Sequence, residues 1–589
     1  MPHRQLLTLL TSVPLLASLT VLAQADYAPR DYYGALYEPD STVLMGVGQR
    51  EELALALYAE AMPEGMFPSL FSTYIPTRAD AERREESMSA LRDLVRYYPD
   101  DLVITVGMSM TNNRRGYTEE ILAGVYDDNI DATARALDSL GTPVIVRIGY
   151  ESNGFWNGYQ PASYRAAFAY VAARLRAVSP RLATAWSIHP IENINQSMTY
   201  YPGDEHVDWW DVSFFQESFI TNQHTRDFMA RAREHRRPVL IGESTPTWVS
   251  PNQVGTEASW DRWYSTFFDA IAAYPAVKAV TYINRDWTTV SGLSDWGNTL
   301  LNADTTVLRR FRERVSSPLY EHIDLGGERL TATVEADTVV QLSRSDTFSL
   351  ANAEAPLFAV GSTDAGDTTA VVLRFDLDSL ADEELRAVKL WVAAHTDVLY
   401  EFDLSVKAVS AEFDADTLTY ANRPRGADTA LARFEVRNFQ RFRLYPIDVT
   451  DLARAAVARG ESRLAFEFVP HQDTVLYYFQ APARAEAYPP RLQVVYDRAP
   501  VSSSAPAAPA TLALTLAPNP AGDRVRVSTT AAAYDYRLLD VTGRVFRSGS
   551  HRAGLDEYVD LRGLPAGSYV VAIRERDSGA RATRVLLVE

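Results

Sequence analysis

The chain has 589 residues, which at roughly 150 residues per domain predicts three or four domains. Its 47% hydrophobic content excludes bulk disorder. The 57 basic and 76 acidic residues give a net charge of −19, which argues against binding to nucleic acid or to an anionic membrane surface. The chain has 0 Cys, which excludes disulfides, thiolate metal sites, a thiol nucleophile and iron–sulfur clusters.

The N-terminus resembles an export signal. His3 and Arg4 form a basic start, Leu6 to Leu22 is apolar, and Ala23 to Ala25 fits the small-x-small rule of a cleavage site. The apolar stretch is too short and too interrupted for a transmembrane helix. We therefore expect cleavage before Asp26, a secreted or cell-surface protein, and no transmembrane segment.

Residues 26–323 alternate apolar runs with helical patterns, as parallel sheets with crossover helices do. Eight strands over about 275 residues predict a (β/α)₈ TIM barrel; an open doubly wound sheet would typically use fewer strands. The expected strands are Thr42–Gly48, Phe67–Ile75, Leu102–Met108, Pro143–Tyr150, Leu182–Ile188, Val207–Phe215, Pro238–Glu243 and Val277–Ile283. The expected helices are Ala79–Tyr97, Thr118–Leu140, Pro161–Val178, Thr225–His235 and Ser259–Tyr274.

The remainder of the chain is rich in short runs of alternating polarity, which predict β-structure. Residues 324–497 are expected to form a jelly-roll-like β-sandwich module. Residues 498–510 are a Pro/Ser/Ala linker, and residues 511–589 a small Ig-like β-sandwich. The expected strands of the first sandwich are Thr338–Leu342, Ala370–Phe375, Ala387–Val392, Phe402–Ala408, Phe442–Pro446, Arg463–Phe468 and Arg491–Tyr496.

Catalytic residues of parallel barrels lie at the C-terminal ends of strands, and two expected strands end in glutamate. In the strand 143–150, alternation places Ile145 and Arg147 toward the barrel axis and Glu151 on the same side. In the strand 238–243, Val239, Ile241 and Glu243 share a parity, which predicts a second carboxyl in the equivalent place. Glycoside hydrolysis needs such a pair of carboxyls. The alternative for Glu151 is a salt bridge to Arg147.

Aromatic residues follow the same strand ends. Sugar rings stack on aromatic faces, so these residues predict substrate subsites, although each could equally cover the barrel. They are Trp156, Tyr159, Tyr200, Tyr201, Trp248, Trp287 and Trp296.

The segments Arg147 to Tyr159, Tyr201 to Asp204, Val207 to Trp209 and Pro238 to Ser244 resemble glycoside hydrolase family 26 of clan A. That family contains retaining β-mannanases, β-1,3-xylanases and mixed-linkage β-glucanases. The resemblance implies that Glu151 is the acid/base and Glu243 the nucleophile. It also implies that Trp287 is the platform beneath the sugar at the cleavage point.

Two positions depart from that pattern. Tyr150 stands where mannanases of the family usually have His, and Phe215 stands where clan members often have a Tyr that supports the nucleophile. Either Gln216 replaces that Tyr or the nucleophile is supported differently. His189 could donate to a sugar hydroxyl or have no role. The complete set of expected substrate-binding residues is Arg147, Tyr150, Asn153, Trp156, His189, Tyr201, Gln216, Trp248 and Trp287.

The second region resembles the DNRLRE modules of carbohydrate-binding module family 96. The matching residues are Leu373 to Leu377, Phe413 to Pro424 and Pro489 to Leu492. The region could instead be a spacer. Loop acids Asp364 and Asp367 could hold a structural Ca²⁺. No metal-binding spacing or phosphate loop appears, so we expect no metal or other cofactor in the catalytic domain.

The last block resembles the type A sorting domain of the type IX secretion system of Bacteroidota. Its motifs are Leu516 to Ala521, Asp540 to Arg544 and Leu564 to Tyr569. The resemblance implies export through the outer membrane and makes the type IX machinery a partner. An ordinary adhesion module would leave the three motifs unexplained together.

These features predict a retaining endo-glycosidase that acts on a plant or algal polysaccharide, with β-mannan as the first choice and β-1,3-xylan or β-glucan next. We expect Glu151 to be held protonated by poor solvation and by the charge of Glu243, with the two carboxyls about 5 Å apart. A catalytically inactive surface glycan-binding protein and an adhesin are the alternatives. We expect a monomer.

Overall fold

The computed structural model describes residues 29–497 and 514–588 apart from short gaps. In the first domain these gaps are residues 49–51, 64, 99–101, 113, 192, 291 and 326–328, and further gaps fall in later loops. The export signal, the linker, Asp364 and Asp367 lie outside the described residues. The chain divides into two units, Met1–Ala499 and Pro500–Glu589, which are described separately.

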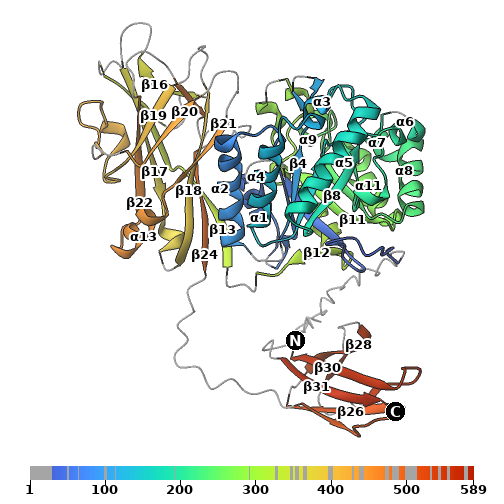
Figure 1. Ribbon diagram of the computed structural model, residues 1–589. Helices are drawn as coiled ribbons and strands as arrows, with labels where there is room; N and C mark the ends of the chain where they lie inside the picture. Colours follow the sequence, from blue (N-terminus) through green and yellow to red (C-terminus); the bar gives the residue numbers. More distant parts are fainter. Residues whose placement is uncertain are drawn as a thin grey trace, which may run out of the picture. The chain divides into compact units, whose positions relative to one another are not determined.

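The first domain is a closed barrel of eight parallel strands (Figure 1). The first strand, β1, pairs with both the second, β3, and the last, β11, which closes the sheet. All eight expected strands are confirmed. They are β1 (Val43–Gly48), β3 (Leu70–Tyr74), β4 (Val103–Met108), β7 (Val144–Ile148), β8 (Leu182–Ile188), β9 (Trp209–Phe214), β10 (Val239–Ser244) and β11 (Val277–Ile283).

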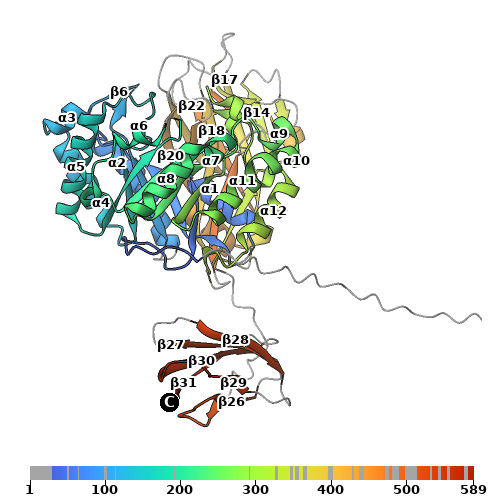
Figure 2. The same ribbon diagram turned by 90° about the vertical axis from the view of Figure 1, so that its right-hand side faces the viewer.

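Helices surround the strands, as both views of the molecule show (Figure 1, Figure 2). Gly124, at φ 77°, separates α3 (Thr118–Leu122) from α4 within one expected helical stretch. Two of the longer helices, α1 and α12, were not among the expected ones. The longer helices are α1 (Glu52–Ala61), α2 (Ala81–Tyr97), α4 (Asp127–Asp138), α5 (Pro161–Val178), α8 (Gln223–Glu234), α11 (Ser265–Ala273) and α12 (Thr305–Val315).

The strands separate two apolar layers. Ile145 and Leu240 belong to the cluster inside the barrel. Val144, Val146 and Ile241 belong to the larger cluster between strands and helices. The alternation expected for the strand 143–150 is therefore confirmed, with Arg147 on the inner side.

A β-sandwich follows the barrel, and all seven strands expected for it are present. Its core takes alternate residues of β17 and β18, such as Leu373 and Leu390. One helix, α13 (Thr450–Ala458), was not expected. The strands are β13 (Arg329–Glu335), β14 (Thr338–Ser343), β15 (Ser349–Ala351), β16 (Leu357–Ser362), β17 (Thr368–Asp376), β18 (Glu384–His395), β19 (Phe402–Val409), β20 (Ala432–Val436), β21 (Arg443–Asp448), β22 (Arg463–Pro470), β23 (Tyr477–Gln480) and β24 (Arg491–Asp497).

Barrel and sandwich share an apolar contact in which Leu53 and Leu57 of α1 pack against Trp391 of β18. Lys389 Nζ lies 3.0 Å from Asp93 Oδ2 beside it. The sequence of α1 is apolar on both sides because one face covers the barrel and the other covers the sandwich. It therefore lacks the one-sided pattern that identifies a surface helix.

The C-terminal unit consists of two small antiparallel sheets, ordered β25-β26-β29 and β28-β27-β30-β31, around a common apolar core. This agrees with the expected small sandwich. Its strands are β25 (Leu514–Ala517), β26 (Arg524–Thr529), β27 (Ala533–Asp540), β28 (Val545–Arg552), β29 (Tyr558–Asp560), β30 (Gly567–Glu575) and β31 (Arg581–Val588).

Candidate active site

Glu151 lies just beyond the C-terminal end of β7. The chain turns there through two residues in the left-handed region, Gly149 at φ 54° and Glu151 itself at φ 51°. A non-glycine residue in this region is strained, and such strain is concentrated at functional sites. Ser187 Oγ on the neighbouring strand accepts a hydrogen bond from Glu151 N at 3.0 Å and fixes the turn. Glu151 is buried but for 7% of its surface.

Glu243 reaches the barrel interior by a different route from the one expected. Ile241 faces the helices, so strict alternation would send Glu243 outward as well. The register with β9 shifts between Ile241 and Glu243, because Ile241 pairs with Val212 and Glu243 with Ser213. This bulge turns Glu243 inward. The parity argument was therefore wrong, although the placement that it predicted is correct.

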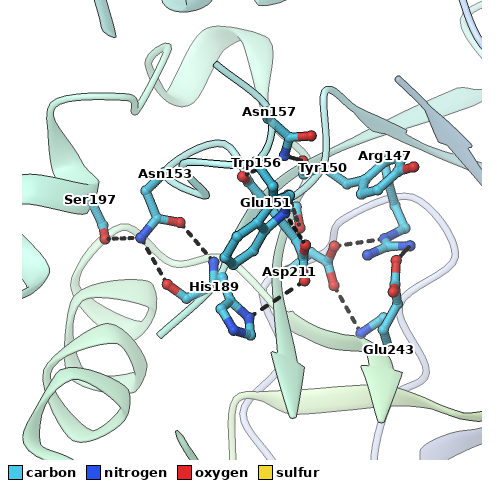
Figure 3. Close-up of polar contacts among 12 residues, drawn as sticks. Arg147, Tyr150, Glu151, Asn153, Trp156, Asn157, His189, Ser197, Asp211 and Glu243 are labelled. Atoms are coloured by element: carbon cyan, nitrogen blue, oxygen red, sulfur yellow. Dashed lines mark hydrogen bonds and ion pairs between the residues drawn. The ribbon is translucent and has the colours of Figure 1, made fainter. Parts of the chain in front are cut away.

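A buried arginine joins Glu243 to a second acid (Figure 3). Arg147 Nη1 lies 3.1 Å from Glu243 Oε1, and Arg147 Nε lies 2.6 Å from Asp211 Oδ2. The other oxygen of Asp211 accepts a hydrogen bond from Gly242 N at 2.8 Å. Arg147 has no exposed surface. Arg147 therefore pairs with Glu243 and Asp211, and the alternative of a salt bridge between Arg147 and Glu151 is not observed among the described residues. Its burial argues against the direct substrate contact that we expected.

Tyr74, at the end of β3, hydrogen-bonds to the Glu243 carboxyl. Its ring packs edge-on against Tyr150, with centroids 5.3 Å apart. Gly107 makes room for the ring, because a Cβ there would lie 2.5 Å from Tyr74 Cδ1. Tyr74 was absent from the expected site. It supplies the hydroxyl that Phe215 lacks.

Glu151 is surrounded by donors. Trp156 Nε1 donates to Glu151 Oε2 at 2.9 Å. His189 Nδ1 lies 3.4 Å from Glu151 Oε1 (Figure 3). Trp156 and His189, expected as substrate contacts, thus both touch the acid/base candidate.

The two carboxyls have different proton affinities. Burial raises the pKa of Glu243, as does the charge of Glu151, and these effects outweigh the lowering by Arg147 and Tyr74. Burial also opposes ionisation of Glu151, but the charge of His189 and the hydrogen bonds to this carboxyl lower its pKa below the usual value. The expectation that poor solvation and the charge of Glu243 keep Glu151 protonated was wrong, because it left out His189.

Asn153 holds the backbone of His189. Its side-chain oxygen accepts from His189 N at 2.8 Å, and its amide donates to His189 O at 2.8 Å and to Ser197 Oγ at 3.1 Å. Asn153 is 5% exposed. It therefore positions a neighbour and does not present its amide to a ligand.

The aromatic residues around the site differ in exposure. Trp248 is 48% exposed and Phe155 74%, so both rings are open to solvent. Trp287, the expected platform, is 3% exposed. It lies in an apolar cluster with Phe215, and its ring centroid is 4.8 Å from that of Trp296.

One expected residue, Tyr201, lies elsewhere. It packs against Trp186 and Trp210, which belong to the apolar layer between strands and helices. Gln216, which follows the end of β9, is the N-cap of α7 (Glu217–Thr221). Within the described part of the chain, no cluster of acidic and histidine side chains could hold a metal ion.

Comparison with known families finds a match in each of the three regions of the chain. Residues 110–232 match Glycosyl hydrolase family 26, a segment that contains Glu151 and ends before Glu243. Residues 329–496 match Carbohydrate-binding module family 96, and residues 515–589 match the Secretion system C-terminal sorting domain. The domain types expected from the sequence are confirmed.

Two curated relatives are similar to part of the chain. A beta-1,3-xylanase from a Vibrio species is 26% identical in an alignment of 316 residues that covers 48% of this chain and 66% of the relative. A beta-1,3-xylanase from an Alcaligenes species is 27% identical in an alignment of 277 residues that covers 42% of this chain and 57% of the relative. The chain thus spans less than two thirds of either relative.

Among solved structures, a modular endo-beta-1,4-mannanase from Cellulomonas fimi is 16% identical and aligns over 57% of this chain and 92% of its own, with a TM-score of 0.37. No helix in the described part of the chain is both long and apolar enough to cross a membrane.

Proposed function

We propose that the protein is an exported retaining endo-glycoside hydrolase that cleaves a β-linked polysaccharide by double displacement. One observation carries this proposal: Glu151 and Glu243 meet at the mouth of the barrel in distinct settings and interact electrostatically. Arg147 and Tyr74 support Glu243, whereas Trp156 and His189 contact Glu151.

In the first step, ionised Glu243 attacks the anomeric carbon while Glu151 gives a proton to the departing glycosidic oxygen. The sugar–oxygen bond breaks and a glycosyl ester of Glu243 forms. In the second step, Glu151 takes a proton from water, whose oxygen attacks the same carbon and releases Glu243. The anomeric configuration is retained because it is inverted twice.

We propose β-1,3-xylan as the substrate and β-mannan as the second candidate. Both curated relatives described above are named beta-1,3-xylanases. Tyr150, which packs on Tyr74 and beneath the guanidinium of Arg147, stands where mannanases of the family usually have His. The sandwich would retain the polymer near the barrel, and the sorting domain would direct export.

The test is reducing-sugar release from β-1,3-xylan, mannan, glucomannan, mixed-linkage glucan and alginate, with Glu151→Gln and Glu243→Gln as variants. We expect activity on β-1,3-xylan that both variants lose. Activity on mannan alone would mean that mannan, and not β-1,3-xylan, is the substrate. Retention of a polymer without hydrolysis by the wild type would favour the glycan-binding alternative and overturn the proposal.

A further inference from the structure

We propose that His189 and Glu151 act as one acid/base unit, with the proton for the departing oxygen shared between the imidazole and the carboxyl. The inference rests on the proposed function and adds a positioning residue to it. Nothing in the sequence pattern required His189 to face Glu151 and not the sugar.

The first evidence is the contact itself. His189 Nδ1 lies 3.4 Å from Glu151 Oε1, while the other carboxyl oxygen accepts from Trp156 Nε1. Both partners are deeply buried, with side chains 6% and 9% exposed. A charge pair at this depth is screened little by solvent, so the proton of either group responds strongly to the state of the other.

The second evidence is that the imidazole is fixed in place. Its ring packs edge-on against Phe219, with centroids 4.6 Å apart, and against Trp156 at 5.0 Å. Phe215 lies at 5.9 Å. The backbone on either side of the ring is held by Asn153. Phe215, which replaces the Tyr common at this position in the clan, therefore helps to hold the histidine.

The third evidence is electrostatic. The charge of His189 and the hydrogen bonds to Glu151 lower the pKa of Glu151 despite its burial. A carboxyl with a lowered pKa is mostly ionised, so it seldom carries the proton that the departing oxygen needs. A pair that holds one proton in total can move it from Nδ1 to Oε1 and deliver it from the carboxyl when the sugar–oxygen bond breaks. In the second step, the proton taken from water returns to the pair.

Other charged groups near the pair belong to the nucleophile network. Glu243 interacts with Glu151 across the site and is paired with Arg147, which also holds Asp211. Tyr74 reaches Glu243. On the remaining side, Asn153 contacts Ser197, whose Oγ lies 3.1 Å from Nε2 of His224.

The first experiment measures kcat/KM against pH for the wild type and for His189→Gln. Glutamine can donate a hydrogen bond but cannot hold the extra proton. We expect the alkaline limb to move to lower pH by about one unit or more, because a carboxyl alone loses its proton before the pair does. His322→Gln is the control, since the ring of that half-buried histidine contacts a backbone carbonyl, Val315 O, at 2.8 Å. An unmoved alkaline limb in folded His189→Gln would overturn the inference.

The second experiment needs neither substrate nor the His189 variant. The histidine ring signals are followed by NMR across pH in the full chain and in Glu151→Gln. We expect the ring signals of one histidine to respond to pH differently in Glu151→Gln, because that ring lies against the carboxyl. If no histidine signal responds differently, the inference is wrong whether or not the protein hydrolyses a polysaccharide. If one does but no polymer is cleaved, the proposed function is wrong and the inference about the pair is supported.

Discussion

The hydroxyl of Tyr74, on the second strand of the barrel, hydrogen-bonds to the carboxyl of Glu243, on the seventh. This bond lowers the pKa of Glu243 against the opposing effect of burial. Burial raises the pKa of Tyr74 well above its usual value, so the phenol keeps its proton and remains a donor throughout the working range. Support for Glu243, the proposed nucleophile, thus comes across the barrel instead of from the end of β9.

Tyr74→Phe removes this donor. We expect kcat to fall about 10-fold to 100-fold with little change in KM, because the hydroxyl touches the nucleophile and not the sugar. Glu243 must be ionised to attack, and its pKa rises when the donor is lost, so the acid limb of kcat/KM moves to higher pH. Tyr264→Phe, which deletes a buried hydroxyl bonded to Tyr282, should leave both limbs in place.

Asp211→Asn should change the pKa of Glu243 in the opposite direction. The charge of Asp211 raises the pKa of Glu243, so its removal should move the acid limb of kcat/KM to lower pH. The amide oxygen can still accept from Gly242 N, which keeps the bulge. Breaking a buried ion pair costs about 3–5 kcal/mol, so the free energy of unfolding should also fall. An acid limb that moves upward would contradict this assignment of charges.

Gly242→Ala tests the bulge that turns Glu243 inward. A Cβ at Gly242 would lie 2.3 Å from Asp211 Oδ1 and 2.6 Å from Arg147 Nε, both fixed in an ion pair. We expect a loss of about 1–3 kcal/mol in stability and a large loss of activity. Ile241→Val, on the same strand but facing the helices, should cost about 0.5–1.5 kcal/mol and leave kcat unchanged. Denaturant unfolding and kinetics on the same samples measure both effects.

Phe155→Ala and Trp248→Ala test the open aromatic faces. Both side chains are largely exposed, so thermal stability should change little. Loss of a stacking face should raise KM for polymer several-fold and affect short oligosaccharides less, because a short chain fills fewer subsites. Trp391→Ala is the comparison variant. Its ring is buried between barrel and sandwich, so the substitution should lower stability and leave KM unchanged.

The architecture was largely predictable from the sequence, because all eight barrel strands are continuous buried runs. Glu151 was predictable too, since β7 alternates without interruption up to Gly149. The inward turn of Glu243 was not, because the shift in register after Ile241 depends on contacts that Gly242 makes with Asp211 and Arg147.

The supporting residues were harder to predict. Tyr74 and Glu243 are far apart in sequence, and only closure of the barrel brings them together. For Asp211 the sequence did contain a signal. It is a charged residue within the apolar run of β9, and such a residue is rarely buried without a partner. Trp287 was expected to be open, but the loop that carries Trp296 covers it.

The stereochemistry of cleavage tests the central claim most directly. ¹H NMR of the first product released from the polymer that the protein hydrolyses, recorded before mutarotation, reports the anomeric configuration. The account predicts a β-anomer from the wild type and no product from Glu243→Ala. An α-anomer, or unaltered turnover in Glu243→Ala, would contradict double displacement through Glu151 and Glu243.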